Sequence, residues 1–238
     1  MKRIIVGAMA RSGSTWTFNA CRMLAERRYG KRAVNASDAK SYQPIDGCGI
    51  EILKAHEPRP DMDGMVITCE RDIRDAFCSG VAVGLLEVAS YARRGLCQGV
   101  YDGMDLLFAD PSRYWGDRAN MAIRFEHMMI DKIGTLRRIA RTIDPDHTIS
   151  PSRLEMIAMQ LEYTPMLYHD YEPSQSYLFG RSHTTGVGVG GHLKHMPWED
   201  AQDMAYHYEE WFEEFNYPID ITASLEASDG QHTLHPQA

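Results

Sequence analysis

Four short apolar runs along the chain are typical of strands buried in a parallel sheet. They cover residues 3–9, 50–55, 65–70 and 120–126. Segments with apolar residues three and four positions apart predict helices that follow or separate these strands. The helical segments cover about 15–28, 73–94, 130–142, 151–163 and 198–215. Short strands that alternate with helices predict an α/β fold of three layers with a central, mainly parallel sheet.

The predicted elements follow one another without an internal repeat, a low-complexity tract or a recognisable linker. We therefore expect one domain over residues 1–222. Residues 223–238 are polar and lack a periodic apolar pattern, so we expect a disordered tail there. The first ten residues also resemble a short signal peptide. Their apolar part is at the short limit for one, so we expect a buried first strand instead.

Charge and cysteine content narrow the classes of function. The 238 residues include 33 acidic and 25 basic side chains, which give a formal net charge of −8. This charge argues against a general nucleic-acid or anionic-membrane binder, but it leaves room for a local basic pocket. The five cysteines form no CxxC pair, which indicates reduced thiols in a cytoplasmic chain. No apolar run reaches the roughly 18 residues needed to cross a bilayer.

The strongest local signal is the small, polar segment 10–16, between the first strand and the first helix. Small residues let backbone amides approach an anion, and the first turn of a helix supplies N–H groups with a partial positive charge. Ser12, Ser14 and Thr15 add hydroxyl donors, and Arg11 adds a cation. The pattern predicts a phosphate site, with an ordinary Gly-Ser turn as the alternative.

This loop differs from the Walker A motif of nucleoside triphosphatases, G-x-x-x-x-G-K-[ST]. Counted from Gly7, the second glycine falls one place late, at Gly13, and Ser14 stands where the lysine should be. A small-molecule or nucleotide kinase that uses ATP and magnesium would lack its phosphate lysine here. We keep such a kinase, and a non-catalytic anion-binding module, as alternative functions.

The loop sequence RSGSTW resembles the 5′-phosphosulfate-binding loop of sulfotransferases that use 3′-phosphoadenosine 5′-phosphosulfate (PAPS), which reads K/R-S-G-[ST]-[ST]-W. The resemblance implies a P-loop-like sulfotransferase architecture and a set of cofactor-binding residues in this loop. These are Arg11, Ser12, Gly13, Ser14, Thr15 and Trp16. Trp16 would stack on adenine, although its place on the first helix fits a core tryptophan equally well.

A second segment, Cys69–Ser79, resembles the family's 3′-phosphate segment, R-[DN]-P-[RK]-D-x-x-x-S. Arg71 and Ser79 have the matching spacing, while Ile73 replaces the usual proline. The resemblance implies that Arg71 and Ser79 bind the 3′-phosphate of PAPS. The alternative interpretation is a helix start with charge pairs three and four residues apart.

A third segment, Lys54-Ala55-His56-Glu57-Pro58, is similar to the K-T-H-x-P strand end of the cytosolic sulfotransferases. Residues two apart in an extended chain point to the same side, so Lys54 and His56 can share one wall of an active site. The resemblance implies that His56 is the general base and that Lys54 and Arg11 stabilise charge on the sulfuryl group. Glu57 is the alternative base.

Two weaker matches occur later in the chain. The segment Ala122–His127 resembles the family's strand that ends in Y-E-D, and Gly186–Lys194 can be aligned with R-K-G-x-x-G-D-W-K. Gly186 stands where the family has an arginine for the 3′-phosphate. Either Arg181 or the loop Gly186–Gly191 would complete that site, unless the loop binds no ligand.

Together these resemblances imply in-line transfer of a sulfuryl group from PAPS to a hydroxyl group, or an amine, of a small-molecule or carbohydrate acceptor. We expect no metal, because His192 and His195 are three apart without an evident third ligand. The acceptor and the oligomeric state cannot be read from the sequence.

Overall fold

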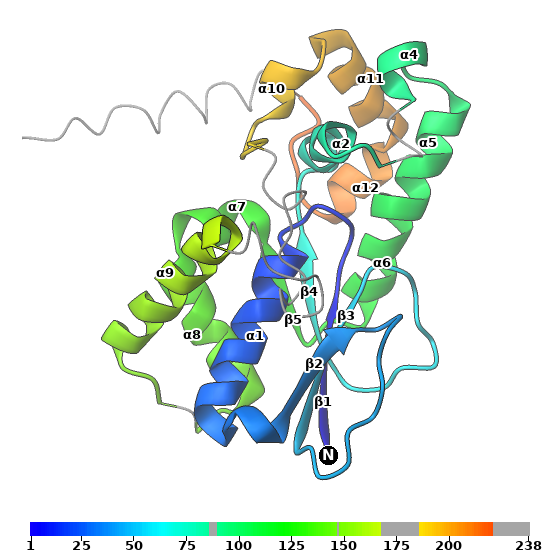
Figure 1. Ribbon diagram of the computed structural model, residues 1–238. Coiled ribbons are helices and arrows are strands. Elements are labelled where there is room, and N and C mark those ends of the chain that lie inside the picture. Colours follow the sequence, from blue (N-terminus) through cyan, green and yellow to red (C-terminus); the bar gives the residue numbers. More distant parts are fainter. Residues whose placement is uncertain (86–89, 147, 168–185, 221–238) are drawn as a thin grey trace, which may run out of the picture. The chain divides into compact units, whose positions relative to one another are not determined.

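The computed structural model describes residues 1–85, 90–146, 148–167 and 186–220 (Figure 1). The chain divides into two compact units. The first unit combines Met1–Arg71 with Met104–Thr185, and the second combines Asp72–Gly103 with Gly186–Ala238. One domain over residues 1–222 stays a prediction, and the expected tail at 223–238 lies outside the described residues.

A parallel sheet forms the centre of the first unit (Figure 1). Its strands within the described residues are β1 (Lys2–Gly7), β2 (Val34–Asp38), β3 (Ile50–Ala55), β4 (Met65–Glu70) and β5 (Met121–Arg124). They lie in the order β2-β3-β1-β4-β5, and each neighbouring pair is parallel. β2 was not predicted, because this edge strand reads VNASD and lacks an apolar run.

Helices cover both faces of this sheet (Figure 1). They are α1 (Ser14–Tyr29), η1 (Lys31–Ala33), η2 (Asp105–Ala109), α6 (Asp110–Asp117), α7 (Phe125–Ile130), α8 (Lys132–Ile143) and α9 (Pro151–Leu167). Ile4 and Val6 of β1 face the core shared with α1, α8 and α9. Ile5 faces the opposite core, which contains Trp115 of α6. This alternation confirms the three-layer α/β fold.

Gly7 ends β1 under the indole ring of Trp115. A Cβ atom at Gly7 would lie 2.2 Å from Cδ2 of Trp115, so only glycine lets the ring pack this closely. The indole Nε1–H donates to the backbone carbonyl of His56 at 3.3 Å. Trp115 therefore connects the end of β1 with the residue that follows β3.

Replacing Gly7 with alanine is expected to destabilise the protein by about 1–3 kcal/mol, because the buried indole ring must move. The measurement is chemical denaturation followed by tryptophan fluorescence. Gly99→Ala is the matched control: a Cβ there meets nothing within 4 Å. It lies in a helix, so its effect should be neutral or slightly stabilising. Equal stability of Gly7→Ala and the wild type would contradict the packing role.

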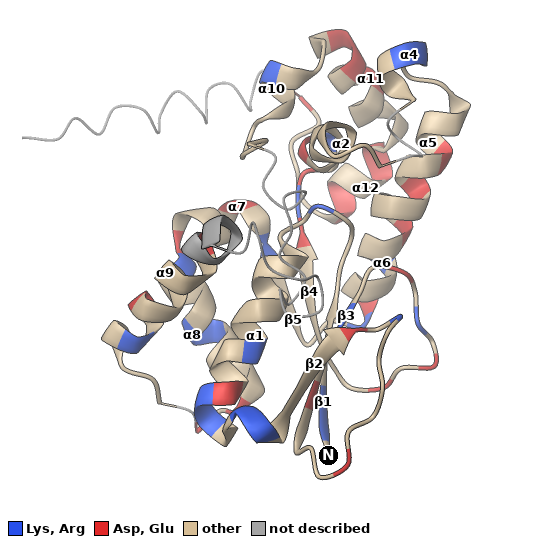
Figure 2. Ribbon diagram, in the orientation of Figure 1, with Lys and Arg blue, Asp and Glu red and all other residues tan. Residues whose placement is uncertain are grey.

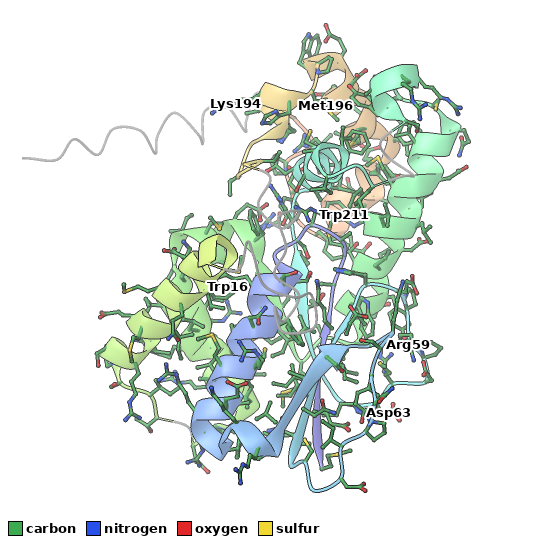
Figure 3. The ribbon with its side chains drawn as sticks, in the orientation of Figure 1. Trp16, Arg59, Asp63, Lys194, Met196 and Trp211 are labelled. Carbon is green, nitrogen blue, oxygen red and sulfur yellow. The ribbon has the colours of Figure 1, made fainter. Side chains whose placement is uncertain are left out.

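The second unit is helical in its described residues. Its helices are α2 (Ile73–Ala82), α4 (Tyr91–Arg94), α5 (Gln98–Met104), α10 (His192–His195), α11 (Trp198–His207) and α12 (Glu209–Glu214). Trp211 is fully buried among them (Figure 3). Acidic residues are frequent along α11 and α12 (Figure 2).

Two predicted helices are shorter in the structure than in the prediction. The helix expected over 73–94 ends at Ala82, because Gly84 adopts a φ of 69° and its N–H donates to the carbonyl of Val81. The helix expected over 198–215 is divided at Tyr208 into α11 and α12. No helix in the described ranges is both long and apolar enough to span a bilayer.

Candidate active site

The predicted phosphate loop lies between Gly7, the last residue of β1, and Ser14, the first of α1. Arg11 and Gly13 have positive φ values of 61° and 88°. A Cβ at Gly13 would lie 2.8 Å from Cε of Met128 and 2.9 Å from a ring carbon of Phe125. Glycine is therefore required at this position for both backbone and packing reasons.

Hydrogen bonds fix the shape of the loop. The N–H of Ala8 donates to Ala55 of β3 at 3.1 Å, and the N–H of Ala10 donates to Leu107 at 2.9 Å. The buried hydroxyl of Ser12 donates to the carbonyl of Met9 at 2.8 Å. Ser12 thus shapes the loop with its side chain, which the sequence pattern alone did not indicate.

The N-terminus of α1 lies at the end of the predicted phosphate loop. Gly13 caps the 16-residue helix without a side-chain hydrogen bond to its first turn. The first-turn N–H groups carry the positive end of the helix dipole, and an anion placed there is stabilised by both effects. Ser14 and Thr15, the first two residues of the helix, are buried at this end.

Lys54 reaches the loop from β3. Its side chain is buried, and Nζ donates to Oγ1 of Thr15 at 2.7 Å. Burial lowers the pKa of Lys54 to about 8; the charge of Asp38 opposes this shift, and the charge of Arg11 adds to it. Burial and a neighbouring cation both disfavour the charged form of the Lys54 ammonium group. A bound anion would offset both effects, so the site favours a negatively charged ligand.

Arg71, which follows β4, also contacts the loop. Its Nη1 donates to the backbone carbonyl of Arg11 at 3.0 Å, and its guanidinium packs over the ring of Phe125 at 4.3 Å. Burial, together with the charge of Arg71, lowers the pKa of Arg11 to about 10. The first unit therefore brings three cations, Arg11, Lys54 and Arg71, around one loop.

His56 is half-buried just beyond β3, and its Nδ1 lies 2.8 Å from the carbonyl oxygen of Ala8. A carbonyl only accepts, so Nδ1 carries the hydrogen and Nε2 is the basic nitrogen of the neutral ring. Glu57, the alternative base, forms an exposed ion pair with Lys40 at 2.6 Å. The choice of His56 over Glu57 as the general base stays a prediction.

Trp16 lies on α1 and is partly buried against the core shared with α8 and α9 (Figure 3). Its Nε1 is buried and has no hydrogen-bond partner among the described residues. This packing fits the core interpretation. Stacking of its ring on adenine stays a prediction.

The remaining predicted residues belong to the second unit. Ser79 is buried on α2. Arg74, five residues before Ser79, has a structural role. Its Nε and Nη2 form a bidentate ion pair with Asp72 at 3.0 and 2.6 Å, and its guanidinium packs over the ring of Phe212 at 4.6 Å. Burial would raise the pKa of Asp72, but the charge and hydrogen bonds of Arg74 lower it overall.

Which of Arg181 and the loop Gly186–Gly191 completes the 3′-phosphate site stays a prediction. Arg181 lies outside the described residues. The loop Gly186–Gly191 belongs to the second unit together with Ser79. No group of three or more potential ligands from His, Cys, Asp or Glu that could hold a metal ion occurs among the described residues.

Comparisons with known proteins show the fold. No family model and no curated protein matches the chain. Retinol dehydratase in complex with androsterone and the inactive cofactor PAP matches with a TM-score of 0.60 and 13% identity, over 90% of this chain and 81% of that one. Retinol dehydratase with retinol and PAP matches with a TM-score of 0.57 and 14% identity, over 90% and 81%. Mouse sulfotransferase SULT7A1 with PAP matches with a TM-score of 0.60 and 12% identity, over 89% and 83%. The chain has the sulfotransferase fold.

Proposed function

We propose that this chain is a sulfotransferase that moves a sulfuryl group from PAPS to a hydroxyl group, or an amine, of a small-molecule or carbohydrate acceptor. One observation carries the proposal: Arg11, Lys54 and Arg71 come from three different segments and surround a hydroxyl-bearing loop at the N-terminus of α1. This set of cations, hydroxyls and backbone N–H groups suits a phosphosulfate.

The chain's residues divide between the two ends of the proposed cofactor. The loop Ser12–Thr15 and the first turn of α1 would hold the 5′-phosphate, with Arg11 and Lys54 beside the sulfuryl oxygens. Arg71 and Ser79 would hold the 3′-phosphate, which distinguishes PAPS from ATP. Bound PAPS would supply the sulfuryl group, with adenosine 3′,5′-bisphosphate (PAP) as the leaving group.

His56 would act as the general base. Its Nδ1–H contact with Ala8 makes Nε2 the basic nitrogen of the neutral ring. As the acceptor oxygen forms its bond to sulfur, its proton would pass to Nε2, and the bond from sulfur to the phosphate oxygen would break. Arg11 and Lys54 would stabilise the negative charge that gathers on that oxygen.

The alternative kinase is less well supported. In a P-loop kinase the hydroxyl after the lysine coordinates magnesium. Here Thr15 accepts a hydrogen bond from the ammonium group of Lys54, and that cation would repel a metal at the same hydroxyl. The lysine also comes from β3 instead of the loop.

Calorimetric titration with PAP, AMP and ATP with magnesium tests the proposal. We expect PAP to bind in metal-free buffer and to bind more tightly than AMP. Preference for ATP with magnesium would overturn the proposal in favour of the kinase. No binding of any of the three nucleotides would mean that the loop is a structural turn.

Binding of PAP is expected to take up protons near pH 8. The pKa of Lys54 is lowered to about 8, chiefly by burial, and a bound phosphate would raise it again. Affinity should therefore be highest below about pH 8 and fall above it, by up to about tenfold per pH unit. Titrations in two buffers of different ionisation enthalpy measure the uptake. Equal affinity at pH 7 and pH 9 would contradict this expectation.

A further inference from the structure

Asp75, in the first turn of α2, is the centre of a buried hydrogen-bond network in the second unit. Its Oδ2 accepts from the N–H of Gly190 at 2.7 Å. Its Oδ1 accepts from both the N–H and Nδ1 of His192, at 2.8 and 2.7 Å. One carboxylate, with only 1% of its surface exposed, thus holds two positions of a segment more than 110 residues away.

His192 is the side-chain partner of Asp75 in this network. Its side chain is 3% exposed, and its Nδ1–H donates to Asp75. Its Nε2 is buried and has no hydrogen-bond partner in the described part of the chain. A ring nitrogen enclosed in this way cannot exchange a proton with a substrate, so the imidazole braces the backbone.

The loop Gly186–Gly191 has a closely specified shape. Gly186 and Gly190 adopt φ values of 74° and 67°. A Cβ at Gly191 would lie 2.6 Å from Cγ1 of Val187. A glycine-rich segment has many backbone conformations available. Its sequence alone does not select one of them, so contacts with other residues must do so. Asp75 supplies those contacts.

Ser79 follows Asp75 by four residues, and residues four apart lie on the same face of a helix. The loop that Asp75 holds and the serine proposed to bind the 3′-phosphate are therefore presented on one face of α2. Both oxygens of Asp75 already accept N–H groups, which offsets its charge close to a proposed anion site.

We propose that Asp75 and His192 are positioning residues for a nucleoside 3′-phosphate: they hold Gly186–Gly191 against α2 beside Ser79, so that the glycine backbone replaces the arginine missing at Gly186. This inference rests on the proposed function. It assigns the two residues to phosphate recognition and gives neither a part in proton transfer.

The test compares PAP with AMP, because AMP lacks only the 3′-phosphate. His192→Ala is expected to lower the ratio of PAP to AMP affinity by at least about tenfold and to leave AMP affinity unchanged. His192→Asn places an N–H near the position of Nδ1, so it should restore most of the ratio. His195→Ala is the matched control, because His195 is exposed on the same helix and should behave as wild type.

A second pair of variants keeps the test decisive if His192→Ala fails to fold. His192→Asn retains a donor at the Nδ1 position, whereas His192→Gln places it at the Nε2 position; only the former should keep the PAP preference. A wild-type ratio in His192→Gln, or an equal loss of PAP and AMP affinity, would overturn the positioning role alone. A wild-type protein that binds PAP no better than AMP would overturn both the inference and the proposed function.

Discussion

Replacing His56 with asparagine is expected to lower the rate of sulfuryl transfer by about 10²- to 10⁴-fold, the usual contribution of a general base. Asparagine can still donate to the carbonyl of Ala8, as Nδ1 of His56 does, but it offers no basic nitrogen. Because His56 is assigned to the acceptor side of the reaction, PAP affinity should stay within a few-fold of the wild type.

The assay would follow ³⁵S from labelled PAPS into a panel of phenols, aliphatic alcohols, amines and sugars, with PAP affinity measured in parallel. Glu57→Gln is the discriminating variant, because Glu57 is the other candidate base and its carboxylate pairs with exposed Lys40. Full activity in His56→Asn together with a large loss in Glu57→Gln would reverse the assignment. Loss of PAP binding in His56→Asn would make it a binding residue instead.

Where a strand is buried on both faces, its apolar run defines it in the sequence. β3 and β4 begin and end at the predicted residues, 50–55 and 65–70. The first run, predicted over 3–9, overshoots β1, because Ala8 and Met9 are buried in the predicted phosphate loop and not in a strand. Apolar character reports burial, and it cannot separate a buried loop from a strand end.

The sequence predicted the segments that form the candidate site. It did not predict the side-chain contacts between them. The loop follows from its small, polar residues between a strand and a helix, and Lys54, His56 and Arg71 follow from the resemblance to sulfotransferase motifs. The hydrogen bond from Lys54 to Thr15 joins residues 39 apart, and the brace between Asp75 and His192 joins residues 117 apart. No local pattern encodes such pairs, because they depend on which strands and helices become neighbours.

Trp115 illustrates a residue whose role the sequence could not assign. In the sequence it is one of several aromatic residues between 84 and 118, a set that favours a core over an acceptor pocket without showing what any single ring contacts. In the structure it packs against Gly7 and donates to the backbone of His56. The signal that could have found it is the small residue at the end of β1, which leaves space for a large ring.

Replacing Lys54 with methionine is expected to weaken PAP binding and, at the same time, to stabilise the ligand-free protein. A charge-assisted hydrogen bond to phosphate contributes about 1.5–3 kcal/mol, so PAP affinity should fall about 10- to 150-fold. The proton uptake near pH 8 should also disappear. Both effects follow from one buried ammonium group. It destabilises the folded protein when no anion is bound, and it strengthens binding when PAP is bound.

The stability gain has a defined pH dependence. Burial lowers the pKa of Lys54 from 10.5 to about 8, and this difference corresponds to about 3 kcal/mol. Below about pH 8 both the folded and the unfolded wild type are protonated at Lys54, so the folded state carries the whole cost of the buried charge. Between about pH 8 and 10.5 only the folded state loses the proton, so the wild type gains stability as pH rises and the advantage of methionine shrinks.

Denaturant unfolding of ligand-free protein at pH 7 and pH 9.5 would measure this difference. Loss of the hydrogen bond to Thr15 offsets about 1 kcal/mol of the gain, so we expect Lys54→Met to be more stable by about 2 kcal/mol at pH 7 and by less at pH 9.5. Lys40→Met is the control, because the side chain of Lys40 is 69% exposed and its ion pair contributes little. A destabilised Lys54→Met that binds PAP as tightly as the wild type would show that Lys54 supports the fold and not the ligand.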